Sequence, residues 1–164
     1  LWTDLFSAEL IKYGANAFLA TKITFINELA QLCEKTGASI TDVACGMGMD
    51  RRIGNLFLKA GPGYGGSCFP KDTLALVQTG QDFDARQTIV ESVIEANEKQ
   101  KQWVFQKINT LLNNDLRKKR IALWGITFKA NTDDIRDATA LTLVPQLIAQ
   151  GVEVIAAHGL EFRL

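Results

Sequence analysis

The chain has 164 residues, with 18 basic and 18 acidic side chains, so its formal net charge is zero. Because binders of nucleic acids or anionic membranes carry a basic excess, this balance argues against both kinds of partner. A hydrophobic fraction of 47% and a charged fraction of 22% are typical of a soluble globular protein. Neither a membrane span nor a signal peptide is recognisable in the sequence.

The cysteines and the histidine limit the chemistry further. The cysteines are Cys33, Cys45 and Cys68, without metal-ligand spacing, and the only histidine is His158. An odd and sparse set of cysteines argues against a disulfide framework and favours a cytoplasmic protein with reduced thiols. We therefore expect no metal site. Cys33 and Cys45 fall in predicted helices and are interpreted as small buried apolar residues, and His158 as incidental.

The N-terminal two thirds of the chain is predicted to be helical. Ser7 is a suitable N-cap for a long helix whose apolar residues keep helical spacing, and Gly37 is a natural stop for it. Thr41 is expected to cap a short helix, and Pro70 to lie in the first turn of a third one. The four predicted helices span residues 8–35, 41–45, 70–77 and 84–112, with an irregular stretch at 50–66.

The character of the sequence changes at the basic run of residues 116–120, which we interpret as a solvated linker. After it come a buried strand at 121–128, a helix at 138–150 and a second strand at 152–157. A strand, a helix and a strand in this order open a parallel sheet. The sequence thus predicts a mostly α domain over residues 1–115 and the start of an α/β domain over residues 116–164.

The densest chemical signal is the run GPGYGGSCFPKD at residues 61–72. Its glycines allow a close approach of the backbone. Cys68 precedes a predicted helix, whose dipole together with Lys71 favours the nucleophilic thiolate, and Asp72 is placed to orient a water or a base. The alternative is a glycine-rich turn with an incidental cysteine, because a reactive cysteine usually has a histidine partner and His158 lies in the other predicted domain.

Five further polar residues are candidates for binding or catalysis. Lys12 and Asn16 are four residues apart on one helix face, where an ammonium and an amide can hydrogen-bond an oxyanion; the alternative is a solvated face. Lys129 follows the first predicted strand, at the edge where open α/β sheets bind ligands. Lys129, Arg136 and Arg52 are candidates for binding a phosphate, and for all three the alternative is ordinary surface charge.

Three long segments, residues 8–38, 50–76 and 125–138, closely resemble the UDP-glucose/GDP-mannose dehydrogenase family, and within it the UDP-glucose 6-dehydrogenases. The resemblance implies an oxidoreductase that converts UDP-glucose to UDP-glucuronate with two NAD, a step toward polysaccharide biosynthesis. It also implies a central helical dimerisation domain, similar to the C-terminal domain of 6-phosphogluconate dehydrogenase, followed by the start of a Rossmann-like UDP-binding domain. Ser67, where relatives that oxidise N-acetylated UDP-sugars typically have a histidine, favours UDP-glucose.

The resemblance implies a role for each candidate residue. A first hydride transfer gives an aldehyde, Cys68 adds to it, a second hydride transfer leaves a thioester, and water hydrolyses the thioester. Lys12 and Asn16 are implied to stabilise oxyanions and position water, with Asp72 assisting. The residues implied to bind the sugar nucleotide are Phe57, Leu58, Lys59, Ala60, Gly61, Gly65 and Lys129, with Arg52 reaching it across a homodimer interface, and those implied to contact NAD are Lys71 and Arg136.

The chain also departs from the family pattern. It lacks the N-terminal NAD-binding domain with its GxGYVG motif and the threonine and glutamate of the catalytic set, and about a third of the UDP-binding domain is present. We therefore expect a fragment that does not turn over on its own. Two alternatives stay open: a 6-dehydrogenase of GDP-mannose or another nucleotide sugar, and a non-catalytic dimerisation module whose catalytic residues are idle.

Overall fold

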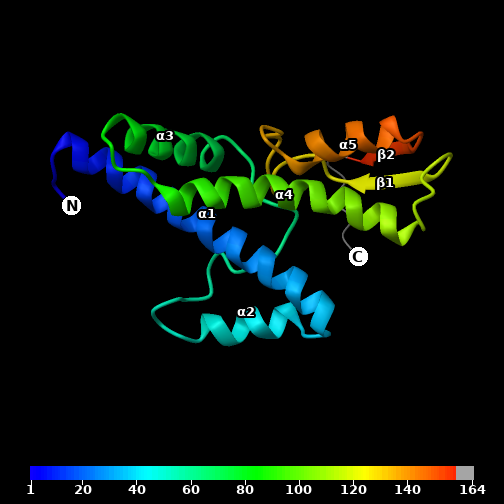
Figure 1. Cartoon of the computed structure of the whole chain (residues 1–164), viewed down its shortest axis with the longest axis horizontal. Helices are drawn as coiled ribbons and strands as arrows, with labels where there is room; N and C mark the ends of the chain where they lie inside the picture. The colour runs from blue at the N-terminus through cyan, green and yellow to red at the C-terminus, as the bar shows by residue number, and fades with distance from the viewer. Residues whose placement is uncertain (158–164) are drawn as a thin grey trace.

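The computed structural model in Figure 1 describes residues 1–157, so His158 lies outside the described residues. The elements in chain order are α1 (Leu5–Thr36), α2 (Ile40–Gly48), α3 (Phe69–Asp82), α4 (Thr88–Leu111), β1 (Arg120–Trp124), α5 (Thr139–Ala149) and β2 (Glu153–Ala157). In Figure 1, α1 crosses the molecule, with α3 and α4 on one side and α2 on the other. The prediction of a mostly α fold followed by the start of an α/β unit is confirmed.

The two ends of α1 show how local capping sets a helix. The carboxylate of Asp4 accepts a hydrogen bond from Ser7 N at 2.9 Å, so Asp4 is the N-cap and the prediction of Ser7 was wrong. A carboxylate is favoured there because it also meets the positive end of the helix dipole. Gly37 adopts the left-handed conformation at φ 78° and ends the helix, as predicted.

Two of the shorter helices also differ from their predicted limits. The side chain of Ser39, not of Thr41, caps α2 by accepting from Asp42 N at 3.2 Å. The helix α3 continues to Asp82 instead of ending at residue 77, because no proline or left-handed residue interrupts it before that point. As predicted, Pro70 lies in its first turn, and Cys68 is the N-cap residue.

Helix α4 contributes to two hydrophobic cores. Its N-terminal half packs against α1 through Val93, which is buried with Ala20 and Tyr64. Its C-terminal half packs against α5, in a core with the members Leu116, Leu143, Leu147 and Val152 and the partly buried neighbours Val104, Phe105, Ile108 and Leu112. The prediction that the whole run 116–120 is solvated was therefore wrong for Leu116, which is 4% exposed.

The strands β1 and β2 form the predicted parallel pair, in a register that joins Arg120 to Glu153 and Trp124 to Ala157. The first strand ends at Trp124 rather than at residue 128, because Gly125 leaves the extended conformation at φ 87°. Burial alternates along β1, and Trp124 is 73% exposed, so the prediction of a fully buried strand was also wrong. Within residues 1–157, α5 and α4 pack against one face of this sheet. Within residues 1–157 no helix is both long and apolar enough to cross a membrane.

Candidate active site

A buried carboxylate joins α1 to α3. Asp72, in the first turn of α3, is fully buried and accepts hydrogen bonds from Asn16 Nδ2 and Lys71 Nζ, each at 2.5 Å. Lys12 Nζ lies 3.4 Å from the same carboxylate. The predicted face of Lys12 and Asn16 therefore points at α3, and Asn16 is 8% exposed rather than solvated. The structure brings together four of the residues predicted from the sequence.

The charges in this cluster are fixed by its hydrogen bonds. Burial raises the pKa of Asp72, but the hydrogen bonds from Lys71, Asn16 and Lys12 outweigh burial and leave the pKa below its ordinary value of 3.8. The hydrogen bond to Asp72 raises the pKa of Lys71 in turn. At neutral pH the cluster therefore holds one buried carboxylate between lysine cations.

An Asp72→Asn variant tests this electrostatic arrangement. A carboxylate whose pKa is lowered on folding stabilises the fold above its unfolded pKa and loses that contribution as the pH falls through the folded value. We expect the variant to be less stable than the wild type by about 1 to 3 kcal/mol at pH 7. The difference should shrink as the pH falls below 3.8. Urea unfolding across this pH range measures both quantities.

The matched control is Asp84→Asn, because Asp84 is exposed and adopts a left-handed conformation that asparagine tolerates. Its stability should stay within about 0.5 kcal/mol of the wild type at every pH. A wild-type minus Asp72→Asn difference that is independent of pH would contradict an ionised Asp72.

Cys68 lies on the same helical turn as this cluster. Its carbonyl accepts from Asp72 N at 2.8 Å, and its exposed Sγ lies 3.7 Å from Ser67 Oγ. The pKa of Arg136 is raised mainly by its hydrogen bond to Asp134, with a smaller contribution from the charge of Cys68. The thiol is thus accessible and within electrostatic reach of the two cations predicted to contact NAD, Lys71 and Arg136. Their exposed heads suit contact with an anionic cofactor.

The other two cysteines provide a contrast. Cys33 is buried in α1, as predicted, but Cys45 is exposed on α2, so the prediction that it is buried was wrong. Cys45 lines an open cavity between α2 and residues 55–60, which leaves it exposed. Cys68 and Cys45 are therefore both exposed but have different surroundings.

The glycine loop, residues 61–66, is clamped between the helices and the segment that connects β1 to α5. Gly66 N donates to Arg136 O at 2.7 Å. A Cβ at Gly66 would lie 2.7 Å from the Phe128 ring, and one at Gly65 would lie 2.7 Å from the carbonyl carbon of Asp137. Glycine is therefore required at Gly65 by the close contact with backbone, and at Gly66 both by contact with the Phe128 ring and by its left-handed conformation at φ 84°.

On the side of the helices, the glycine loop is held by three buried amide side chains that the sequence analysis missed. Asn97 bonds to both the N–H and the C=O of Tyr64, while Asn27 and Gln100 bond to Gly61. One signal was present in the sequence: Asn97 is four residues after Val93, on the apolar stripe of its helix. A polar residue at such a position needs a buried partner.

A cavity of about 430 Å³ opens beside the glycine loop, and we call it the central cavity. Its lining comprises Ile23, Phe57, Lys59, Ala60, Gly61, Pro62, Gly63, Tyr64, Gly65, Phe69, Phe128 and Lys129. The two lysines come from opposite parts of the chain, and four aromatic residues line the cavity with them, Phe57, Tyr64, Phe69 and Phe128. Cations beside flat apolar surfaces suit a ligand with phosphates and an aromatic base. Six of the predicted substrate-binding residues line this one cavity, and Phe69, which follows Cys68 in the chain, lines it too, whereas Cys68 is not among its lining residues.

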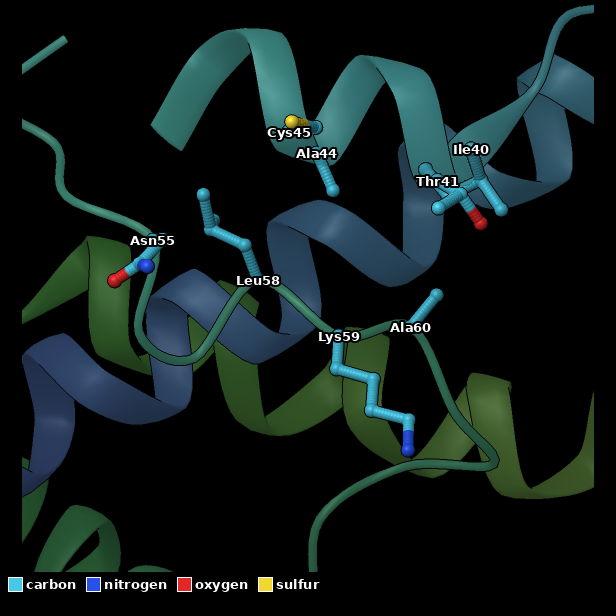
Figure 2. A pocket seen from close by; sticks show the side chains of 8 residues that line it. All are labelled: Ile40, Thr41, Ala44, Cys45, Asn55, Leu58, Lys59 and Ala60. Atoms are coloured by element: carbon cyan, nitrogen blue, oxygen red, sulfur yellow. The ribbon is translucent and has the colours of Figure 1, made fainter. Parts of the chain in front are cut away.

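Two predicted substrate residues do not reach the central cavity. Figure 2 shows the Leu58 side chain pointing toward Ala44 and Cys45, whereas Lys59 points away from α2. Leu58 is 4% exposed and lines a separate cavity of about 450 Å³ against α2. Arg52 is exposed and pairs with Asp50 at 2.5 Å, away from the central cavity. Its implied role across a dimer interface stays a prediction.

Comparison with known proteins gives a consistent result. Residues 6–99 match the model of the UDP-glucose/GDP-mannose dehydrogenase family, central domain, and residues 122–158 match the UDP binding domain of the same family. The chain is 53% identical to a UDP-glucose 6-dehydrogenase of Rhizobium meliloti over 94% of its own length. It spans only 35% of that relative, about a third.

Two solved structures of the family resemble this chain to different degrees. A UDP-glucose dehydrogenase from Pyrobaculum islandicum superposes with a TM-score of 0.86 at 37% identity, covering 92% of this chain and 34% of the other. A GDP-mannose dehydrogenase from Pseudomonas aeruginosa superposes with a TM-score of 0.56 at 31% identity, over 92% of this chain and 34% of the other. Both the sequence and the fold of this chain are therefore more similar to the first.

Proposed function

Because the chain belongs to the UDP-glucose/GDP-mannose dehydrogenase family, we propose that it supplies the sugar-nucleotide cavity and the nucleophile of an NAD-dependent UDP-glucose 6-dehydrogenase. The product is UDP-glucuronate. One observation carries this proposal: six residues predicted to bind the sugar nucleotide, from both parts of the chain, line one cavity, which Phe69, the residue after Cys68, also lines. Similarity to the UDP-glucose dehydrogenase from Pyrobaculum islandicum favours UDP-glucose over GDP-mannose, and the serine at position 67 favours it over N-acetylated UDP-sugars.

The proposed chemistry takes place at Cys68. The thiolate adds to the aldehyde carbon of the half-oxidised sugar, which gives a thiohemiacetal; oxidation of this adduct gives a thioester, which water hydrolyses to the carboxylate. NAD, when bound, supplies the oxidation by accepting hydride. Lys71 and Arg136 would hold this cofactor through their exposed cationic heads, close to the thiol.

The Asp72 cluster prepares the site for the negative charge that develops on oxygen. Lys12 is half exposed, so its ammonium can turn from Asp72 toward an alkoxide or thiohemiacetal oxygen. Asn16 is held by Asp72 and needs no reorganisation during the reaction. Groups fixed in advance stabilise a transition state better than groups that must be ordered. Asp72 itself keeps both donors in place.

Protection of Cys68 from iodoacetamide tests the proposal on this chain. Cys68 and Cys45 are both exposed, but Cys68 precedes Phe69, which lines the central cavity, whereas Cys45 lines the cavity against α2. UDP-glucose at ten times its dissociation constant should slow alkylation of Cys68 about tenfold and leave Cys45 unchanged. Mass spectrometry of the two peptides measures both rates in one sample.

Three outcomes of this experiment separate the possibilities. Selective protection by UDP-glucose, with weaker protection by GDP-mannose, supports the proposal. Stronger protection by GDP-mannose would assign the other nucleotide sugar. Equal alkylation of Cys68 with and without either ligand would contradict a sugar-nucleotide site at this position.

A second function, homodimer assembly, is proposed from the surface of α1. Four large apolar side chains repeat every seven residues along the helix, and each is at least 50% exposed: Ile11, Phe18, Phe25 and Leu32. A stripe with this period stays on one helix face over several turns and is typical of a helix that pairs with another. A second copy of the chain supplies the same stripe, so the interface is self-complementary. This assembly is also what places Arg52 near the site of the other subunit.

A further inference from the structure

The three buried amides behind the glycine loop have no part in the proposed chemistry. We propose that Asn27, Asn97 and Gln100 are positioning residues that set the shape of the central cavity, and hence its affinity for the sugar nucleotide, without affecting the reactivity of Cys68. The inference rests on the proposed function, since it concerns the same cavity. Its physical basis is a set of four hydrogen bonds between side chains and backbone.

Tyr64 is held from both of its backbone groups by one side chain. Asn97 Oδ1 accepts from Tyr64 N at 2.8 Å, and Asn97 Nδ2 donates to Tyr64 O at 3.0 Å. Asn97 is 1% exposed, and a Cβ at the preceding Gly63 would lie 3.1 Å from Asn97 Oδ1, so the loop has no room to shift toward α4. The pair of bonds fixes the orientation of the peptide as well as its position.

Gly61 is held in the same way, but by two side chains. Its N–H donates to Asn27 Oδ1 and its C=O accepts from Gln100 Nε2, both at 2.8 Å. Gln31 Nε2 donates to Gln100 Oε1 at 2.6 Å and so orients the amide with its donor toward the loop. The residues from α1 and α4 together replace the water that a surface loop would bind.

These bonds act directly on the central cavity. Residues 61–65 all line it, so a displacement of Gly61 or Tyr64 moves the cavity wall. Asn97 and Gln100 are hydrogen-bonded at both ends of the amide, whereas Asn27 is bonded through Oδ1 and its buried Nδ2 has no partner among the described residues. An amide paired at both ends favours a single arrangement, because any other arrangement leaves polar groups unsatisfied. The loop is therefore preorganised before a ligand arrives, which lowers the cost of ordering it on binding.

The thiol end of the run is held separately. Gly66 N donates a hydrogen bond to Arg136 O, and Cys68 is the N-cap of α3. The positions of Gly66 and Cys68 therefore do not depend on the three buried amide side chains. Loss of one of these side-chain hydrogen bonds should consequently weaken ligand binding and leave the reactivity of the Cys68 thiol unchanged. Substitution of a residue with a purely structural role would change the stability of the chain, but it would not weaken ligand binding while the reactivity of Cys68 stays the same.

Two substitutions of different severity test the inference in the full chain. Asn97→Asp keeps the acceptor for Tyr64 N and replaces the donor to Tyr64 O with an oxygen. Gln100→Met keeps the size of the side chain and removes the donor to Gly61 O. We expect each variant to bind UDP-glucose about tenfold more weakly in calorimetry, whereas alkylation of Cys68 without ligand keeps its wild-type rate. The same changes at exposed or half-exposed positions of α4, Asn109→Asp and Gln106→Met, are the matched controls.

The results distinguish the inference from the function on which it rests. Wild-type affinity in Gln100→Met, or in a folded Asn97→Asp, overturns the positioning role and leaves the proposed function standing. An equal loss of affinity and of Cys68 reactivity also overturns it, since the loop would then act as one unit with the thiol. Failure of the wild type to bind UDP-glucose overturns both. If Asn97→Asp does not fold, Gln100→Met alone decides.

Discussion

Replacing Gly65 with alanine should destabilise the chain by about 3 kcal/mol or more and loosen the contact between its two parts. The added Cβ would lie 2.7 Å from the carbonyl carbon of Asp137 and 3.2 Å from Ala138 N, and closer still to Asp137 O. These atoms are backbone, so no rotation of a side chain relieves the overlap. The glycine loop and the segment 125–138 must move apart, which also strains the hydrogen bond from Gly66 N to Arg136 O.

Gly61→Ala is the matched control, because Gly61 lies in the same loop and a Cβ there meets no atom within 4 Å. We expect its stability to stay within about 0.5 kcal/mol of the wild type. Urea unfolding, followed by tryptophan fluorescence and by circular dichroism, measures the free energy of unfolding of both variants. Equal losses in the two would show that the loop tolerates a side chain poorly everywhere, and that the contact with Asp137 is not the cause.

The double variant Phe18→Glu, Phe25→Glu should convert a dimer into a monomer. In the proposed dimer each subunit buries two phenylalanines of the α1 stripe, and each contributes about 1 to 2 kcal/mol. Their loss, together with four carboxylates placed in the interface, should raise the dissociation constant at least about a thousandfold. Light scattering after size exclusion gives the mass of each form directly.

Phe83→Glu serves as the control for this variant, because Phe83 is 78% exposed but lies at the end of α3, off the stripe. The control should keep the wild-type mass. A wild-type chain that stays monomeric from micromolar to millimolar concentration would contradict the dimer outright. A dimer that survives the double variant would place the interface on another surface.

Local patterns predicted most of the elements but not their limits. Asp4 and Ser7 are both good N-caps three residues apart, and the sequence does not show which one the helix uses. The strand β1 was predicted too long because IALWGITF is a continuous, mostly apolar run. In the structure, Gly125 turns the backbone out of the sheet. Leu116 was interpreted as solvated from its charged neighbours, and its burial depends on α5, which comes later in the chain.

The site was predictable where its residues form motifs and unpredictable where they meet through the fold. The spacing of Lys12 and Asn16 places them on one face, and the structure adds that Asp72 is their shared partner. No pattern along the chain relates Asn97 to the backbone of Tyr64, 33 residues away. Leu58 was assigned to the substrate by its position in a motif, but alternation along an extended backbone turns it toward α2.

The sharing of α4 between two cores sets a practical limit on how the chain can be divided. A shortened protein that starts at the basic run would carry α5 and both strands but would lack Val104, Phe105 and Ile108, which cover Leu143 and Leu147. Its bare apolar surface would favour aggregation. An autonomously folding C-terminal unit therefore has to begin within α4, one or two turns before Val104. Each half, expressed alone, therefore has to include part of α4. Grafting either half onto a relative requires the same helix in the same register.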